Sequence, residues 1–409
     1  MDLRVIIESA VRTHPSTQAQ RALREGAEVD VRTARQQFLP TPSVSLENVQ
    51  TGALDPSYRG NAWLQTYRLQ QPLWTGGRLS AGLAKAQANA QAAGFAHEEA
   101  AQQLALRAVQ AWGEWQTASL KIVALKASEA THQRLYEQVQ RRVTHGASAA
   151  IELELTEGRL AQTRAQVQAT QAQLRAARMK VSQLLGAAVE GQSPTQSLRH
   201  RMPEPAVLEE QVLQRSPALL KQLAQLQAQQ AEFAERRAEL LPEVYLRVER
   251  LNSHYESAIM SSSSSTRYSV GLSTRLGAGL SSLSALESFE RRMEAAQAEL
   301  ESIRRNLREQ VQADWEQWNS LQLRIPALQR SLQASQATAE AWDRQFLAGR
   351  KSWLEVMNTA RELLQAELEL ADAQSAQIQL TWRLALLSLG WQDTLSAASP
   401  VPEYPNSRP

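Results

Sequence analysis

Apolar and polar residues along this chain follow two different periods, and the period changes twice. Most of the sequence is rich in Ala, Gln, Glu, Leu and Arg, as expected of α-helices, but residues 43–47 and 268–276 largely alternate between apolar and polar side chains. Such alternation is typical of a β-strand with one apolar face. Each strand region follows a helical segment that a proline ends, at Pro40 and at Pro242, 202 positions apart. The pattern predicts a mainly helical fold with a small β part at two equivalent places.

These two places belong to an internal repeat. Residues 14–40 align without gaps on residues 216–242, and Gly146 and Gly349 align at an offset of 203 farther along the chain. A nearly constant offset of this size indicates duplication of a whole half, because a solenoid would show many copies of a shorter unit. We therefore predict an internally duplicated chain.

Each half is expected to contain the same succession of elements. The first repeat, residues 1–190, is predicted to hold short helices, a β-hairpin at about 42–74, a long helix at about 78–145 and a helix at about 148–185. The second, residues 208–395, is predicted to hold a helix, a hairpin at about 243–276, a long helix at about 280–348 and a helix at about 352–389. Proline-rich residues 191–207 are the expected linker, and residues 396–409 the expected C-terminal tail.

The predicted long helices and short hairpins suggest an assembly. A helix of about 67 residues spans about 100 Å, which is more than a globular core requires. Hairpins of this kind match the weak signature of membrane-spanning β-strands, although an ordinary half-buried hairpin gives a similar pattern. Four strands from one chain cannot close a barrel, and lipid does not tolerate an open sheet edge. A membrane-spanning function would thus require several copies.

Composition and charge narrow the function classes. The formal charge is +2 with acidic and basic residues interleaved, a pattern of solvated helix faces that gives no sign of nucleic-acid binding. The chain has no cysteine, and its six histidines include no pair at the i, i+4 spacing of a zinc-binding helix. We therefore expect no enzyme activity, no catalytic residue, no metal and no cofactor.

The chain has no run of 18 apolar residues, so no transmembrane helix is predicted. Residues 1–4 lack the basic and apolar regions of a signal peptide. Either the protein is cytoplasmic, or a signal peptide has been removed and Met1 added in its place.

Residues 3–391 resemble the TolC-like family of outer-membrane efflux proteins. The resemblance rests on the doubled helix–Pro–hairpin–helix–helix unit and on three segments, QPLWTGGR (71–78), VTHGASAAIEL (143–153) and FLAGRKSWLEV (346–356). It implies a homotrimer whose twelve-stranded outer-membrane β-barrel continues into a long periplasmic α-helical barrel. It also implies an exit duct in a tripartite efflux pump or type I secretion system. The partners would be a periplasmic adaptor, an inner-membrane transporter and outer-membrane lipid.

The resemblance also assigns residues near two glycine-marked turns. Gly146 and Gly349 would mark the helix-tip turns that contact an adaptor. Glu152 and Glu355 fit an acidic pore constriction, and Asn358 stands where a second acid is often found. Carboxylates gathered in such a ring favour cations and can have raised pKa values. The alternative is that both acids are ordinary solvated residues on a helix surface.

Three further residues fit a latch at the periplasmic entrance. Lys351 fits the place of a latch cation, and Arg350 lies beside it. Phe346 stands where an aromatic hydroxyl is common, but phenylalanine cannot donate a hydrogen bond. One contact of the latch is therefore expected to be missing.

A soluble coiled-coil scaffold or adaptor is the alternative function. It explains the helical composition, but it explains neither the paired hairpins nor the repeated Pro and Gly positions. It also requires sustained heptads, whereas the apolar spacing drifts between residues 104 and 123. Two Trp pairs, 112/115 and 315/318, recur at equivalent places and are predicted to be helix-packing anchors.

Overall fold

The computed structural model describes residues 2–49, 62–189, 202–255, 263–274 and 281–397. Most of the expected linker at 191–207 and of the expected tail at 396–409 lies outside these ranges. The elements in chain order are α1 (Leu3–Thr13), α2 (Pro15–Gln36), β1 (Thr41–Val49), β2 (Ala62–Trp74), α3 (Arg78–Thr144), α4 (Ala150–Leu185), α5 (Pro205–Arg215), α6 (Pro217–Ala238), β3 (Glu243–Tyr255), β4 (Ser263–Ser273), α7 (Ser281–Leu347), α8 (Trp353–Leu389) and α9 (Trp391–Ala397).

One succession of elements occurs twice. A 22-residue helix, a β-hairpin, a 67-residue helix and a helix of 36 or 37 residues follow one another from α2 to α4 and again from α6 to α8. The prediction of a mainly helical fold with a small β part is confirmed. No described helix is long and apolar enough to cross a membrane.

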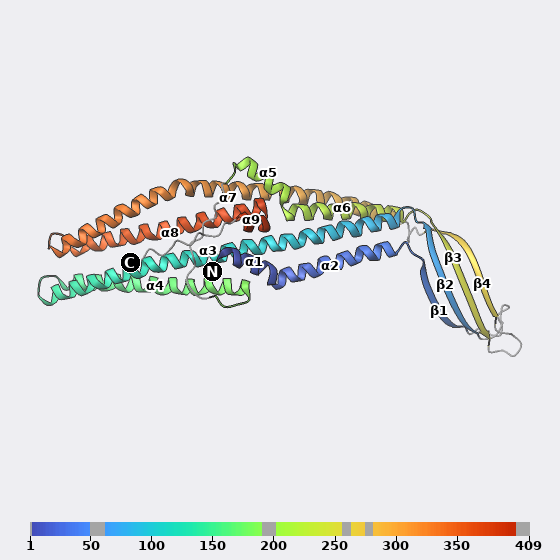
Figure 1. Cartoon of the computed structure of the whole chain (residues 1–409), viewed down its shortest axis with the longest axis horizontal. Helices are drawn as coiled ribbons and strands as arrows, with labels where there is room; N and C mark the ends of the chain where they lie inside the picture. Colours follow the sequence, from blue (N-terminus) through green and yellow to red (C-terminus); the bar gives the residue numbers. More distant parts are fainter. Residues whose placement is uncertain (1, 50–61, 190–201, 256–262, 275–280, 398–409) are drawn as a thin grey trace. The chain divides into compact units, whose positions relative to one another are not determined.

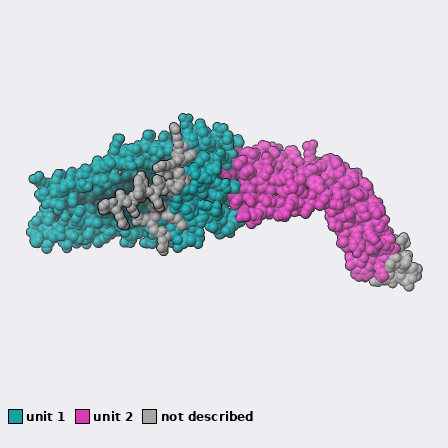
Figure 2. All heavy atoms as spheres, viewed as in Figure 1, with its two compact units in different colours: residues 1–19, 98–216, 304–409 teal, residues 20–97, 217–303 magenta. Residues whose placement is uncertain are grey.

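The chain forms two compact units (Figure 2). Unit 1 comprises residues 1–19, 98–216 and 304–409, and unit 2 comprises residues 20–97 and 217–303. Both α3 and α7 contribute residues to each unit. Each unit is therefore described by itself.

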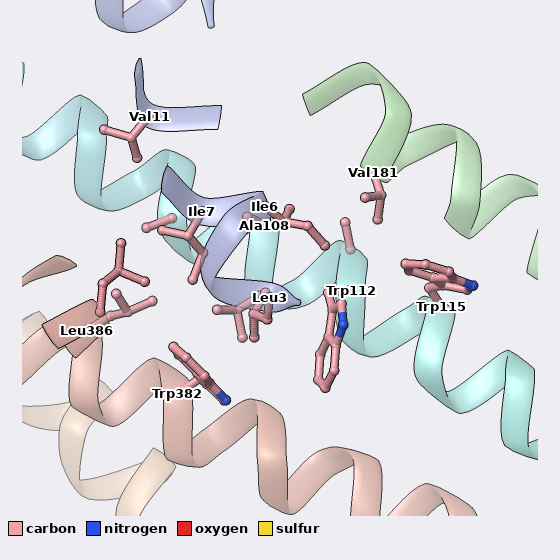
Figure 3. Packing of buried hydrophobic residues seen from close by; sticks show 14 of the residues in the cluster. Leu3, Ile6, Ile7, Val11, Ala108, Trp112, Trp115, Val181, Trp382 and Leu386 are labelled. Atoms are coloured by element: carbon pink, nitrogen blue, oxygen red, sulfur yellow. The ribbon is translucent and has the colours of Figure 1, made fainter. Parts of the chain in front are cut away.

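The largest hydrophobic cluster of unit 1 forms where α1 and α9 pack against the longer helices (Figure 3). Trp112 and Trp115 of α3 and Trp382 of α8 are all fully buried there. Leu3 and Ile6 of α1 pack among them because the apolar residues of this short helix lie on one face. The predicted anchoring role of the Trp112/Trp115 pair is confirmed.

Polar contacts connect α7 to its neighbours in unit 1. The indole N–H of Trp318 donates to Thr381 Oγ1 at 3.0 Å, and that of Trp315 donates to the Pro203 carbonyl at 3.3 Å. The Arg383 guanidinium donates to Asp314 Oδ2 at 2.7 Å, and Asp314 is only 9% exposed. Burial raises the pKa of Asp314, although Arg383 acts in the opposite direction.

The four strands of unit 2 form one antiparallel sheet in the order β1-β2-β3-β4. Directly paired residues lie on the same face, so the register assigns each side chain to a face. One face is rich in apolar side chains, most of them exposed: Val44, Leu46, Tyr67, Leu69, Leu246, Val248, Tyr268, Val270 and Leu272. Within the described residues β1 and β4 each pair with a single strand, so the sheet is open and is not a closed barrel.

The opposite face of the sheet is polar. Arg68 donates to Glu249 at 2.9 Å across β2 and β3, and Arg247 donates to Gln70 at 3.0 Å. The Arg247 guanidinium also lies 4.7 Å from the ring of Tyr245. Serine and threonine occupy much of the remaining face. The sheet therefore has one apolar and one polar surface.

Glycines and ion pairs join the sheet to the helices within unit 2. Gly76 and Gly77 adopt φ values of +61° and +91° between β2 and α3. A Cβ on Gly76 would lie 2.7 Å from Leu241 Cβ, so the close approach requires glycine as well. Arg78 of α3 then contacts Glu243 of β3 at 2.6 Å. The turn is thus determined by backbone conformation, packing and charge together.

Candidate functional site

Two short turns join long helices in unit 1, and both lie at the same end of this unit (Figure 1). Each contains one glycine with a φ of +72°, Gly146 after α3 and Gly349 after α7. The N–H groups of Gly349 and Arg350 each donate at 2.9 Å to carbonyls in the last turn of α7. Those of Gly146 and Ala147 repeat the pattern on α3 at 2.9 and 2.7 Å. Both helices therefore end in a Schellman motif, which explains the glycines.

The two acids predicted for a constriction occupy equivalent positions. Glu152 is the third residue of α4 and Glu355 the third residue of α8, where a carboxylate interacts favourably with the helix dipole. The helix starts differ in their caps. Ser352 and Glu355 form a reciprocal capping box, whereas Ala149 before α4 supplies no side-chain cap. Glu355 thus has a local structural role that Glu152 lacks.

Lys351 and Glu355 form the shortest ion pair of this region. Lys351 Nζ lies 2.6 Å from Glu355 Oε1 and 4.2 Å from the centroid of the Trp342 ring. Hydrogen bonds from Lys351 and from the backbone and hydroxyl of Ser352 lower the pKa of Glu355 to about 2. This direction is opposite to the one expected for carboxylates gathered in a ring. Within one chain, the nearby cation and N–H donors determine the direction.

Phe346 lies in a hydrophobic cluster and is only 4% exposed. The cluster joins α3, α7 and α8 through Leu135, Val139, Phe346, Trp353, Val356 and Met357. The Arg142 guanidinium of α3 lies 5.3 Å from the Phe346 ring. In place of a hydroxyl contact, Phe346 provides packing and a cation–π contact between α3 and α7.

The structure brings some of the predicted residues together and leaves others apart. Lys351 and Glu355 are in contact and lie close to the Phe346 cluster through Trp342. Arg350 and Asn358 are exposed. In the described part of the chain, no side-chain hydrogen bond, ion pair or cation–π contact joins Arg350, Asn358 or Glu152 to this network.

Three residues of the network were missed by sequence reasoning: Arg142, Trp342 and Ser352. A signal for Ser352 was present, because the S-x-x-E spacing of residues 352–355 is typical of a capping box. The contacts of Arg142 and Trp342 depend on how three helices pack, and no local spacing indicates them.

The arrangement provides a charge pair and an apolar cluster at a helix junction. Among the residues that the structure describes, no group of three or more His, Asp and Glu could hold a metal ion. A charge pair beside packed aromatic rings can fix the spacing of α3, α7 and α8 and the local electrostatic potential.

Comparison with known proteins gives one family and several similar structures. Residues 6–187 and 208–388 match the outer membrane efflux protein family. The outer membrane protein VceC from Vibrio cholerae has a TM-score of 0.82 at 16% identity, covering 95% of this chain and 96% of VceC. CusC has a TM-score of 0.82 at 19% identity, covering 94% of this chain and 91% of CusC. The Campylobacter jejuni CmeC outer membrane channel gives 0.80 at 13% identity, covering 97% and 90%. A search of curated proteins finds no match to this sequence.

Proposed function

Because the chain belongs to the outer membrane efflux protein family, whose members are outer-membrane channel components and not enzymes, we propose that three copies form the exit duct of a tripartite export system. The substrate would leave through a β-barrel in the outer membrane after passing an α-helical barrel in the periplasm. The partners would be a periplasmic adaptor and an inner-membrane transporter. A tripartite efflux pump and a type I secretion system both use such a duct.

The open, two-faced sheet is the observation that carries this proposal. Its apolar face suits lipid and its polar face suits a water-filled lumen. An open edge in lipid would leave backbone N–H and C=O groups without partners, which is costly. Pairing β1 of one copy with β4 of the next removes every edge, and three copies give twelve strands.

The glycine turns would form the periplasmic end of the duct. We propose Gly146 and Gly349 as marks of the adaptor-contacting tips, and Glu152, Glu355 and Asn358 as constriction residues. Lys351 would act as the latch cation, beside Arg350, and Phe346 would act through packing. Because Lys351 neutralises Glu355 within its own chain, Glu152 would supply the larger uncompensated negative charge.

The duplicated succession of elements supports a second part of the proposal. Residues 1–190 and 208–395 would be two structural repeats, each supplying one hairpin and one long helix to the duct. The two segments that match the family lie within these limits.

Cysteine cross-linking tests the closure of the barrel, since the chain has no cysteine of its own. Ser45→Cys on β1 is combined in turn with Arg267→Cys or Ser269→Cys on β4. We expect at least one pair to give a covalent ladder that ends at three copies under oxidising conditions. Each single variant has one thiol per chain, which faces a strand without a cysteine, so it should give no ladder and at most a two-copy species; this provides the control. A ladder that ends elsewhere, or none with any pair, would contradict the trimer.

Conductance tests the duct itself. In a planar lipid bilayer the detergent-purified protein should give stable, small, cation-preferring steps. Repeated failure to insert, together with a rod-like species in detergent-free buffer, would favour the coiled-coil scaffold.

A further inference from the structure

A cavity of about 310 Å³ lies within unit 1, lined by residues of α3, α4 and α8. This volume is at the lower end of the range for small-molecule pockets, about 300–1,000 Å³. Two arginines line it, Arg159 and Arg361, and its described lining includes no aspartate or glutamate. The cavity therefore has a net positive charge.

Neither arginine has an acidic partner among the described residues. Both arginines are exposed. Arg159 donates to the amide oxygen of Gln162 at 3.2 Å, and the side chain of Arg361 makes no hydrogen bond or ion pair within the described chain. Arg164, farther along the same helix, shows the contrast, because it contacts Glu129 at 3.3 Å and also donates to Gln133 at 2.8 Å. Two guanidinium groups at one cavity attract an anion, and they bind a carboxylate well because of their planar donor geometry.

A buried histidine supplies a second polar feature. His132 of α3 lines the cavity and is only 5% exposed. Its Nδ1 lies 2.8 Å from the carbonyl oxygen of Ser128. The hydroxyl oxygen of the same serine lies 3.2 Å from Nδ1. A carbonyl can only accept, so this geometry favours the tautomer with its hydrogen on Nδ1, in which Nε2 is an acceptor. Nε2 has no partner in the described part of the chain, so the cavity offers an unused acceptor.

The rest of the lining is largely apolar or neutral. Trp353, Met357 and Leu364 of α8 present apolar surface, and all three are buried. Exposed amide side chains of α4 and α8 also line the cavity, among them Gln162, Gln166 and Gln365. The cavity thus combines an apolar wall, two cations, several neutral amides and the unused acceptor of His132.

We propose that this cavity binds a small amphipathic aromatic acid that carries a hydroxyl group away from its carboxylate. The carboxylate contacts Arg159 and Arg361, the ring packs on Trp353 and Met357, and the hydroxyl donates to Nε2 of His132. The proposal goes beyond the exit duct and does not rest on it, because binding is measured directly and not through transport.

Isothermal titration calorimetry on the full chain in detergent tests the ligand class with three probes. These are 6-hydroxy-2-naphthoate, 2-naphthoate and 2-naphthol, each corrected by a titration into detergent alone. We expect 2-naphthoate to bind about threefold to tenfold more weakly than the hydroxy acid, since it lacks one neutral hydrogen bond. We expect 2-naphthol to bind about tenfold to a hundredfold more weakly than the hydroxy acid, because it has no carboxylate to contact the two arginines. Equal affinities, or no binding of the hydroxy acid, would overturn the proposal.

Variants locate the binding. Arg159→Gln combined with Arg361→Gln should weaken both acids by at least about tenfold and leave 2-naphthol unchanged. Arg175→Gln, an exposed arginine of α4 outside the lining, is the matched control and should change nothing. Unchanged affinity of the acids in the double variant would assign the binding to another place.

Two further variants test the cavity wall. His132→Phe keeps a ring of similar size but removes Nε2, so the preference for the hydroxy acid over 2-naphthoate should disappear. Gln166→Trp fills the opening while keeping His132 and both arginines, and it should weaken every probe. This second variant keeps the test decisive if His132→Phe folds poorly. Full affinity in Gln166→Trp would exclude the cavity as the site.

Discussion

At the scale of single residues, Lys351 determines the charge state of Glu355. Its Nζ lies 2.6 Å from the Glu355 carboxylate. This hydrogen bond is the largest of the effects that lower the pKa of Glu355 to about 2. A carboxyl whose pKa is lowered in the folded state stabilises that state at pH values above its unfolded pKa of about 4.3. The contribution is lost as the pH falls through the range between about 4.3 and about 2.

Lys351→Met should raise the pKa of Glu355 toward its ordinary value, because it removes the strongest hydrogen bond to the carboxylate. The ring of Trp342, which Lys351 also contacts, can report the change by fluorine NMR of protein containing 5-fluorotryptophan. The wild-type signal should titrate near pH 2, and the variant should lose that transition. Trp342→Phe identifies the signal. A variant that still titrated near pH 2 would show that the Ser352 donors alone determine the pKa.

Asp314 and Arg383 test the value of a partly buried ion pair. The Asp314 side chain is 12% exposed and that of Arg383 is 42% exposed, at an N–O distance of 2.7 Å. Arg383→Met should lower the free energy of unfolding by about 2–3 kcal/mol at neutral pH, because it leaves a buried carboxylate without its partner. The loss should be smaller in acid, because burial raises the pKa of Asp314 and protonation removes the unpaired charge.

Denaturant unfolding in detergent at one protein concentration provides the measurement. Arg308→Met is the matched control, since Arg308 contacts Glu209 at 2.8 Å in a more exposed pair. The control substitution should lower the free energy of unfolding by less than about 1 kcal/mol. Equal losses in the two variants would show that burial of Asp314 does not matter.

At the scale of elements, Gly→Ala should have opposite effects on stability at two positions, because the backbone conformation differs between them. Gly349→Ala should destabilise the α7–α8 turn by about 1–2 kcal/mol, because its φ of +72° is left-handed. No atom outside its immediate neighbours lies within 4 Å of the added Cβ, so the cost is conformational. Gly158→Ala, within α4 and equally unobstructed, should stabilise by about 0.5–1 kcal/mol. Denaturant unfolding that gave the same sign for both would contradict this explanation.

The missing cap of α4 suggests a gain-of-stability variant. Ala149 occupies the position that Ser352 holds before α8, and Glu152 is already in place to complete a capping box. Ala149→Ser should add about 0.5–1 kcal/mol to the first turn of α4. Hydrogen exchange of peptides covering residues 147–155 should slow, while Ser352→Ala should accelerate exchange at the start of α8. Unchanged exchange in both variants would show that the caps do not limit local opening.

The elements were largely predictable from sequence, and the contacts between them were not. Pro40 and Pro242 follow helix ends, and apolar–polar alternation marks parts of the strands, so local pattern is enough to indicate the two hairpins. The partners of Phe346 and Lys351 depend on the packing of three helices, which no local period reports. The resemblance assigned Phe346 to a latch, but it could not indicate that the residue is buried against α3.

At the scale of the whole molecule, the two unpaired edges of the sheet relate structure to assembly. A hydrophobic core can be completed within one chain, but the edges of β1 and β4 have no further strand to pair with in the described chain. From the sequence, the need for several copies could be inferred only from the small number of predicted strands. The number three is what the family resemblance implies, and the cross-linked ladder tests it.

The open edges also have a genetic consequence. Ser45→Pro on β1 would remove one backbone N–H from this edge strand and weaken its pairing without touching the helices. In a ring of three, one weakened edge is enough to prevent closure, so the variant should be dominant over the wild type. With both chains made in equal amounts, only about one ring in eight would contain wild-type chains alone. Protein purified from cells that express both chains should therefore give about one eighth as many channels in planar bilayers as wild-type protein. A fall to only one half would indicate that each chain works independently.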